Sequence, residues 1–316
     1  MEWSREQLLA LVSKQFGVDG ERVSFQPIVT GKFNRSYVVR MDGREVVLRI
    51  APIPGTPMLF YEKDMMRQEP QIHCLVRERT QVPVPAILAY DFSRTVIPSD
   101  YLFLEKLPGV AASELPLTRT VWNRVLEQVG GYLRQVHAIS GPAYGYVGPH
   151  HPMDPQPSWW EAFRIMWQKL VQQIVEMEAY TREQGEWLVE ALERRRSFFD
   201  REVPPSLLHM DIWSQNVLLD HSGNVTGIVD WDRALYGDPE IEYAVLDYCG
   251  ISEPAFWRGY GKERERSEAA QVRLWFYFLY EHQKYIVIRG LRNRRWDLAM
   301  RYRDDCLRLA RQWLGG

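Results

Sequence analysis

The sequence predicts an α+β fold in two lobes, a small antiparallel-sheet lobe over residues 1–105 and a larger, mainly helical lobe over residues 106–316. Apolar runs typical of strands gather in the first third of the chain, whereas apolar residues at helical spacing dominate the remainder. The run Leu107-Pro108-Gly109 separates the two parts and predicts a hinge. We expect a ligand in the cleft between the lobes, because pockets tend to form where domains meet.

The small lobe is expected to contain five strands and two helices. Ser4 and Gln7 have the spacing of a helix capping box, and Asp42-Gly43 is a strong two-residue hairpin turn. A second helix is expected over about 60–79. The strand-like segments cover roughly 21–29, 34–41, 44–51, 86–91 and 98–105.

The larger lobe is expected to be helical apart from one hairpin. Helical spacing covers 119–138, and two helices are expected within 158–200. Asp238 and Pro239 are expected to begin a later helix as its N-cap and first-turn residue. The aromatic run from Trp275 to Tyr280 lies on another helix, and most of its rings are expected in the core.

The composition gives no reason to expect nucleic acid or a membrane as a partner. The formal net charge is −2 and no basic block stands out. The N-terminus lacks the features of a signal peptide, and no apolar run is long enough to span a bilayer. The three cysteines form no close pair, so we expect the reducing cytoplasm rather than a disulfide framework. Monomer and dimer are both compatible with the sequence.

The most informative run extends from His209 to Asn216, reads H-x-D-x-x-x-x-N and is followed by Asp230. Residues 216–220 and 225–229 are expected to form a hairpin about the turn His221-Ser222-Gly223-Asn224. Pairing of residue 220 with residue 225 would set Asn216 opposite Val229, so that Asn216 and Asp230 meet at the open end. Asp211 lies on the loop that enters the first strand, near the same point.

These side chains match the chemistry of phosphoryl transfer. The amide oxygen of Asn216 and the carboxylate of Asp230 suit Mg²⁺, which completes its shell with water and phosphate oxygens. Asp211 can accept the proton of an incoming hydroxyl as the catalytic base and hold that hydroxyl in line with phosphorus. His209 is expected to brace the loop, and Asp232 to support Asp230. The alternative is a polar loop that merely satisfies backbone donors.

The region that would cover a nucleotide carries a weaker signal. A P-loop is excluded, because Gly31-Lys32 has no glycine five residues earlier and no Ser or Thr after it. The turn that contains Gly31 and Ser36 is expected instead to cover phosphates with backbone amides, although a plain hairpin turn explains it equally well. The backbone groups of Glu105 and Leu107 in the hinge are expected to read the edge of the base.

Arg49 stands in an apolar strand where protein kinases carry the lysine of their V-A-I-K motif. It is expected to pair with nucleotide phosphates and to be held by a helix carboxylate. Glu69 is the first choice for that carboxylate, but Pro70 disfavours helical geometry at residue 69. Either a helix restarts there with Pro70 in its first turn, or Glu62 or Glu78 takes the role.

With these motifs in place, the chain resembles the aminoglycoside phosphotransferase and choline kinase-like superfamily of small-molecule kinases over about residues 23–248. The resemblance implies a two-lobed, protein-kinase-like fold, ATP or GTP with Mg²⁺, and transfer to a hydroxyl of an antibiotic or metabolite. It also implies that Asp211 is the catalytic base and that Asn216 and Asp230 hold the metal. The motifs are Gly31-x-x-Asn34-x-Ser36-Tyr37-Val38-Val39, Val47-Leu48-Arg49-Ile50, Leu102-Phe103-Leu104-Glu105-Lys106-Leu107-Pro108-Gly109, His209-x-Asp211-x-x-x-x-Asn216, Ile228-Val229-Asp230-Trp231 and Gly237-Asp238-Pro239-Glu240-Ile241-Glu242.

The sequence departs from the family pattern at Met210, where the family often has glycine, and at Arg49, which replaces the commoner lysine. An aminoglycoside-like antibiotic is the first expectation for the acceptor, and a metabolite such as choline, homoserine or a sugar is the alternative. A pseudokinase that binds nucleotide without catalysis is the second alternative. Asp247, Glu253 and Glu281 are candidates to attract a cationic acceptor.

Overall fold

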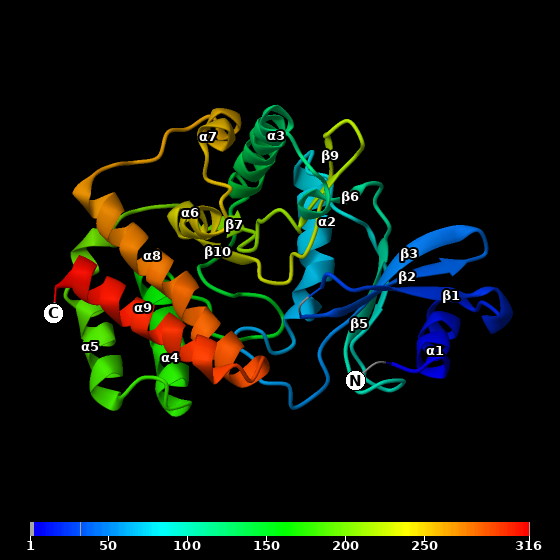
Figure 1. Cartoon of the computed structure of the whole chain (residues 1–316), viewed down its shortest axis with the longest axis horizontal. Helices are drawn as coiled ribbons and strands as arrows, with labels where there is room; N and C mark the ends of the chain where they lie inside the picture. Colours follow the sequence, from blue (N-terminus) through cyan, green and yellow to red (C-terminus); the bar gives the residue numbers. More distant parts are fainter. Residues whose placement is uncertain (1–2, 32, 316) are drawn as a thin grey trace.

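The structure, a computed structural model, describes residues 3–31 and 33–315. Its small lobe holds one antiparallel sheet in the order β1-β2-β3-β5-β4, and the rest of the chain is mainly helical (Figure 1). The predicted two-lobed α+β fold is therefore confirmed. The elements of the small lobe are α1 (Arg5–Phe16), β1 (Ser24–Ile28), β2 (Arg35–Met41), β3 (Arg44–Ile50), α2 (Glu69–Arg79), β4 (Ile87–Asp91) and β5 (Tyr101–Glu105).

The sheet of the small lobe is buried on both faces. Leu48 and Phe103 pack with residues of α1, whereas Leu102 and Leu104 pack with Met66 just before α2. Successive side chains of a strand point to opposite faces. Arg49, the residue after Leu48, therefore points to the side of the sheet that carries α2.

The helix expected over residues 60–79 begins later than predicted. Residues 60–64 form turns, a 3₁₀ turn covers Met65–Gln68, and α2 starts at Glu69. Pro70 occupies the first turn of α2, where a missing N–H costs no helical hydrogen bond. Proline explains the shorter helix, because its ring is tolerated at a helix start and not in the interior.

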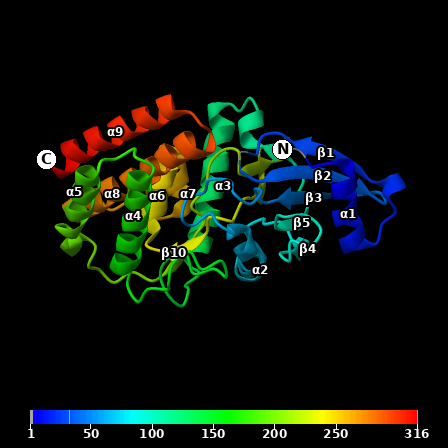
Figure 2. The same cartoon turned by 90° about the horizontal axis from the view of Figure 1, so that it is seen from below.

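The larger lobe contains helices α3 to α9 (Figure 2). It also holds two small sheets, β10-β7 and β6-β8-β9. β5 ends at Glu105, and β6 after the Pro-Gly run pairs with β8 of the larger lobe, while the boundary at residues 105–106 stays a prediction. The elements are β6 (Val110–Ala111), α3 (Arg119–His137), α4 (Trp159–Glu176), α5 (Arg182–Glu193), β7 (Ser206–Leu208), β8 (Val217–Leu219), β9 (Val225–Ile228), β10 (Leu235–Gly237), α6 (Pro239–Tyr248), α7 (Pro254–Tyr260), α8 (Glu268–Val287), a π-helix (Ile288–Arg292) and α9 (Trp296–Leu314).

Aromatic rings fill the core between α4 and α8. Phe163 of α4 lies edge-on to Tyr277 of α8 with ring centroids 4.9 Å apart, and Trp167 meets Phe276 in the same manner at 5.4 Å. Phe276, Tyr277 and Tyr280 are buried, so the prediction for this aromatic run is confirmed. Within the described part of the chain, no helix combines the length and apolar character needed to cross a bilayer.

The predicted hairpin is present as β8 and β9. Val217 pairs with Ile228, and the Val229 N–H donates to the Asn216 carbonyl at 3.0 Å, so Asn216 lies opposite Val229 as expected. The pairing of residue 220 with residue 225 was wrong. A bulge shifts the register so that Leu219 pairs with Val225, and the Asp220 carboxylate accepts the Ser222 and Asn224 N–H groups at 2.8 Å, which shapes the turn.

Candidate active site

A buried carboxylate binds the backbone of the loop between β7 and β8. Glu242 of α6 accepts the backbone N–H of Met210 at 2.5 Å and that of His209 at 3.2 Å. The same side chain pairs with His137 Nε2 at 2.7 Å and is fully buried. Met210 has φ of 65°, a left-handed conformation that glycine adopts without strain. Glu242 thus stabilises a backbone turn that Met210 does not favour by itself.

Asp211 and Asn216 meet within this loop, as the sequence predicts. The Asn216 side-chain amide donates to the Asp211 carbonyl at 2.9 Å and to Asp211 Oδ2 at 3.0 Å. Both amide hydrogens of Asn216 are thereby used, which leaves its amide oxygen turned toward other partners. The loop geometry therefore presents one carboxylate and one amide oxygen side by side.

His209 braces the loop from its buried position. Its Nδ1 accepts the Asp211 N–H at 3.2 Å, and its Nε2 lies 3.1 Å from the Val229 carbonyl, to which it donates. Burial lowers the pKa of His209 below its ordinary value, although the Glu242 carboxylate opposes this effect. A neutral ring with its proton on Nε2 satisfies both contacts. His209 also packs against Trp231 with ring centroids 4.4 Å apart.

Arg49 joins the two lobes at the cleft. It forms an ion pair with Glu69 at 2.5 Å, another with Asp230, and a third with Asp232 at 3.2 Å. Burial disfavours the charged guanidinium, but the three carboxylates raise the pKa of Arg49 above its ordinary value. Burial likewise disfavours ionised Glu69, yet Arg49 holds the pKa of that carboxyl below its usual range. The predicted pairing of Arg49 with Glu69 is therefore present.

The two alternative partners for Arg49 lie elsewhere. Glu62 forms an ion pair with Arg292, and Glu78 accepts a hydrogen bond from Cys74 Sγ at 3.1 Å. Glu69 is also contacted by His73 Nε2 at 3.3 Å, one helical turn along α2. The helix thus restarts with Pro70 in its first turn, which is one of the two expected alternatives, and the Glu69 side chain reaches Arg49 of β3.

Asp232 is a buried junction between the lobes. Its Oδ2 accepts a hydrogen bond from Asn34 Nδ2 at 2.9 Å, and its carbonyl accepts one from Gln68 Nε2 at 2.5 Å. Burial and the neighbouring Asp230 carboxylate raise the pKa of Asp232 well above its ordinary value. Asp232 therefore fixes Asn34, in the segment that follows β1, and shares Arg49 with Asp230, while its supporting role toward Asp230 stays a prediction.

The residues expected to cover the nucleotide lie around the cleft side of the small-lobe sheet and in the hinge. Ser36 pairs with Arg49 across β2 and β3, so it lies beside the cleft, while Gly31 is exposed in the turn after β1. Lys32 lies outside the described residues. The Glu105 N–H donates to the Ala86 carbonyl at 2.9 Å and is therefore not available to a base. The roles of the Glu105 carbonyl and of Leu107 in base recognition stay predictions.

Arg233 is a site residue that the sequence did not indicate. Its NH1 donates to Asp211 Oδ1 at 2.5 Å and its NH2 to the Tyr61 hydroxyl at 3.1 Å. Tyr61 in turn stacks on Tyr146 with ring centroids 4.7 Å apart. No spacing rule predicts this contact; the one available signal was an arginine directly after Asp232. Glu242 was also missed in its role, although it lies within a motif of the resemblance.

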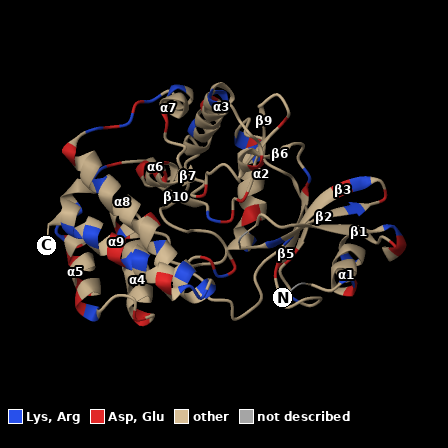
Figure 3. Cartoon of the chain, viewed as in Figure 1, with Lys and Arg blue, Asp and Glu red and all other residues tan. Residues whose placement is uncertain are grey.

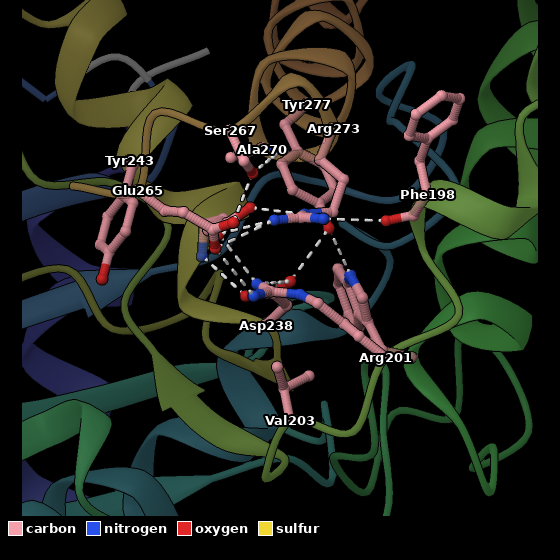
Figure 4. Close-up of polar contacts among 12 residues, drawn as sticks. Phe198, Arg201, Val203, Asp238, Tyr243, Glu265, Ser267, Ala270, Arg273 and Tyr277 are labelled. Carbon is pink, nitrogen blue, oxygen red and sulfur yellow. Dashed lines mark hydrogen bonds and ion pairs between the residues drawn. The ribbon is translucent and has the colours of Figure 1, made fainter.

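The segment after Asp232 is anchored at the start of α6. Asp238 caps α6 by accepting the Glu240 N–H at 3.0 Å, as predicted, and forms an ion pair with Arg201 at 2.6 Å (Figure 4). Arg273 of α8 binds Glu240 at 2.7 Å and the Phe198 carbonyl at 2.9 Å. This network fixes the first turn of α6, the helix whose Glu242 holds the loop with Asp211.

The residues present fit a hard cation such as Mg²⁺. The Asp230 side chain is 35% exposed, and its only ion pair within the described chain is with Arg49. Asp230 has φ of 71°, a left-handed conformation that residues other than glycine seldom adopt, and its carboxylate reaches Arg49 of the small lobe. No group of three or more His, Cys, Asp or Glu residues suited to a metal occurs in residues 3–31 and 33–315. A cation here would rest on Asn216, Asp230, water and phosphate oxygens.

Comparison with known proteins places this geometry in a family. A model of the phosphotransferase enzyme family matches residues 24–275. The chain is 30% identical over 130 residues to ketosamine-3-kinase of Mus musculus, which is 41% of either chain. It is 37% identical over 78 residues to a candidate ketoamine kinase of Lactiplantibacillus plantarum, or 25% of this chain and 27% of that protein. The matched stretches thus span less than half the length of these relatives.

Solved structures resemble the whole chain. A candidate fructosamine-3-kinase from Haemophilus somnus superposes with a TM-score of 0.67 at 19% identity, covering 96% of this chain and 97% of that one. Aminoglycoside phosphotransferase APH(4)-Ia superposes with a TM-score of 0.64 at 19% identity, covering 97% and 99%. A thermostable mutant of that protein, with AMP-PNP and hygromycin B, gives a TM-score of 0.62 at 20% identity, covering 95% and 98%. These likenesses establish a shared fold.

Proposed function

We propose, since the chain belongs to the phosphotransferase enzyme family, that it transfers the terminal phosphoryl group of ATP to a hydroxyl of a small molecule. One observation carries the proposal. Asn216 donates to Asp211 within the loop before β8, while Asp230 lies across the open end of the hairpin and faces Arg49 of the other lobe. A base, two oxygen ligands and a phosphate-binding cation are the groups that phosphoryl transfer requires.

Each group has a distinct role in this proposal. Asp211 is the catalytic base, which accepts the proton of the acceptor hydroxyl and orients its oxygen toward phosphorus. Arg233 and Asn216 hold the two oxygens of that carboxylate. Asn216 and Asp230 hold Mg²⁺, which would neutralise charge on the phosphate oxygens. His209 and Asp232 position these residues and touch neither reactant.

The small lobe supplies the nucleotide contacts. Glu69 keeps the Arg49 guanidinium in place through NH1, and phosphate oxygens would bind NH2 in competition with Asp230 and Asp232. The turn with Gly31 and Ser36 covers the phosphates, and the backbone of Glu105 and Leu107 borders the base. ATP is the first choice of nucleotide, supported by the AMP-PNP complex of a protein with this fold. GTP is the alternative.

The acceptor we favour is a sugar-derived amine of the ketoamine class. Two curated relatives that carry such names are 30% identical over 41% of this chain and 37% identical over 25% of it, and two structures of candidate fructosamine-3-kinases are 19% and 18% identical over nearly all of it. An aminoglycoside is therefore the second candidate, which reverses the order expected from sequence motifs. The shared chemistry is a polyhydroxy ring or chain beside an amine.

A coupled ADP-release assay tests the proposal. The panel contains ketoamines, aminoglycosides, choline, homoserine and free sugars, each with ATP or GTP and with or without Mg²⁺. We expect acceptor-dependent ADP release that requires Mg²⁺. Nucleotide binding without ADP release for every acceptor would instead favour the pseudokinase alternative, and calorimetric titration with a non-hydrolysable ATP analogue separates these outcomes.

A further inference from the structure

A connection between the two lobes runs through residues 51–68, which link β3 to α2 and are called the β3–α2 connection. It leaves the small-lobe sheet and packs on the larger lobe, where Leu59 and Tyr61 are each 1% exposed within the main core cluster. Gln173 of α4 donates a side-chain N–H to the Met58 carbonyl at 2.6 Å. This part of the small lobe is therefore anchored to the core of the larger lobe.

The end of α8 anchors the same connection a second time (Figure 1). Arg292 of the π-helix forms an ion pair with Glu62 and donates from Nε to the Pro57 carbonyl at 3.4 Å. Glu62 also accepts the Leu59 N–H at 2.7 Å. In Figure 3, residues of opposite charge lie together where the connection passes this end of α8. Tyr61 thus lies between two anchored points, Pro57 and Glu62.

Tyr61 is held in one orientation. Its ring stacks on Tyr146 of the larger lobe with centroids 4.7 Å apart and an interplanar angle of 8°, and Phe60 lies edge-on to it at 5.2 Å. Its hydroxyl accepts a hydrogen bond from Arg233 NH2 at 3.1 Å. Stacking and burial keep such a ring from turning, so the hydroxyl offers Arg233 a fixed acceptor.

The connection also binds the backbone around Arg233. Gln68, which is 2% exposed, donates from Nε2 to the carbonyl of Asp232 at 2.5 Å and to that of Ala234 at 3.1 Å. These two residues flank Arg233. An arginine side chain has many rotamers, and fixing only one of its ends leaves several of them accessible. Gln68 fixes where this side chain begins, and Tyr61 fixes where it ends.

The two oxygens of Asp211 are held by groups that depend on different lobes. Asn216 donates to Oδ2 at 3.0 Å from within the larger lobe, whereas Arg233 donates to Oδ1 at 2.5 Å. The contact between Arg233 and Asp211 is a charge-assisted hydrogen bond, which is roughly twice as strong as a neutral one. The direction of the carboxylate therefore depends on Arg233 and, through the β3–α2 connection, on the small lobe.

We infer that Tyr61 is a positioning residue for the transfer: it holds Arg233, which orients Asp211, so that the small lobe fixes the direction of the catalytic carboxylate. The inference rests on the proposed function, because Asp211 acts as a base only in that reaction. Tyr61 acts through Arg233 and makes no contact of its own with the reactants. Glu69, the residue after the connection, holds Arg49. One continuous stretch of chain thus positions both the proposed base and the proposed phosphate-binding cation.

Tyr61→Phe tests the inference, because it removes only the hydroxyl and keeps the stacked ring. In the coupled ADP-release assay with an accepted acceptor, we expect kcat to fall about tenfold, since a small misplacement of a catalytic group lowers the rate steeply. The KM values for ATP and for the acceptor should stay as in the native protein. Tyr180→Phe, at a tyrosine of the same core that is 2% exposed, is the matched control and should keep the native kcat.

A second background separates positioning from packing. Arg233→Gln should itself lower kcat, and adding Tyr61→Phe should lower kcat no further, because the path from Tyr61 to Asp211 is already broken. A hydroxyl needed only for packing would cost the same factor in both backgrounds. That result, a native kcat in Tyr61→Phe, or an equal loss in Tyr180→Phe would overturn the inference and leave the proposed function standing. No ADP release from the native protein with any acceptor would refute the proposed function and the inference with it.

Discussion

At the scale of single residues, Asp211 is held on both of its oxygens. Arg233 donates to Oδ1 at 2.5 Å and Asn216 to Oδ2 at 3.0 Å. A catalytic group held in this way loses rotamer freedom before the acceptor arrives, which lowers the entropic cost of reaching a reactive geometry. The same contacts keep the carboxylate in a fixed orientation toward the open end of the hairpin.

His150 makes stability sensitive to acid. Burial lowers the pKa of His150 from 6.5 to about 4, an effect that His151 increases and Asp64 opposes. The unfolded chain therefore binds a proton below pH 6.5 that the folded chain binds only near pH 4. Stability is fully present above pH 6.5 and falls as the pH drops toward 4, by about 2–3 kcal/mol from this residue.

His150→Gln should reduce that acid sensitivity. Urea unfolding at pH 7 and pH 4.5 measures the difference in the free energy of unfolding, and the variant should show a difference smaller by about 2 kcal/mol. His221→Gln, at an exposed residue, serves as the control. An unchanged pH dependence in His150→Gln would contradict the assignment of this effect to His150.

Gln283 is a buried polar residue without a partner. Its side-chain nitrogen and oxygen are both buried and form no hydrogen bond with any residue that the structure describes, and the residue itself is 0% exposed. Gln283→Met keeps an unbranched side chain of similar length and removes the unsatisfied amide. We expect the free energy of unfolding to rise by about 1–2 kcal/mol. If urea unfolding gives a lower free energy of unfolding for Gln283→Met than for the native protein, the amide of Gln283 has a partner, such as a buried water.

At the scale of elements, the start of α6 connects the core of the larger lobe to the catalytic loop. Asp238 caps the helix and binds Arg201, and one turn later Glu242 accepts two backbone N–H groups of the loop. Any tilt of α6 would therefore move Asp211. The geometry of the site therefore depends on the position of α6 as well as on the β8–β9 hairpin.

Asp238→Ala should cost more than the loss of an ordinary helix cap. Loss of an exposed cap costs about 1 kcal/mol of the free energy of unfolding. The Asp238→Ala substitution in addition removes the carboxylate to which Arg201 and the Tyr277 hydroxyl donate. We expect a loss of about 3 kcal/mol by urea unfolding. Thr181→Ala, which removes the exposed cap of α5, is the matched comparison. Equal losses in the two variants would show that the ion pair contributes nothing.

The elements that sequence reasoning predicted well are those fixed by local chemistry. Two strand-like segments around a turn predicted that Asn216 lies opposite Val229. The N-cap at Asp238 was predicted because an aspartate side chain directly before Pro239 accepts an N–H of the first helical turn. The bulge near Leu218 was missed, because one extra residue in a strand leaves no compositional signal. Arg233 and Glu242 were missed for another reason. Their contacts depend on how β10 and α6 pack beneath the loop.

At the scale of the whole molecule, charged side chains connect the lobes across the cleft. Arg49 of the small lobe binds Asp230 and Asp232, and Arg292 of the larger lobe binds Glu62. Mg²⁺ and phosphates would compete with the ion pair between Arg49 and Asp230. Mg²⁺ would take the Asp230 carboxylate, and the phosphate oxygens would take the Arg49 guanidinium. Arg49 and Asp230 therefore connect the two lobes and are also the groups proposed to bind phosphate and Mg²⁺.

The most direct test of the account compares Asp211→Asn with the native protein on an accepted ketoamine. The variant keeps the size of the side chain and loses the base, so kcat should fall by about 10²–10⁴-fold. Calorimetry should give nearly the same ATP affinity for both proteins, since Asp211 is not proposed to bind nucleotide. Turnover at the native rate in Asp211→Asn would contradict the assignment of Asp211 as the catalytic base and, with it, the proposed site.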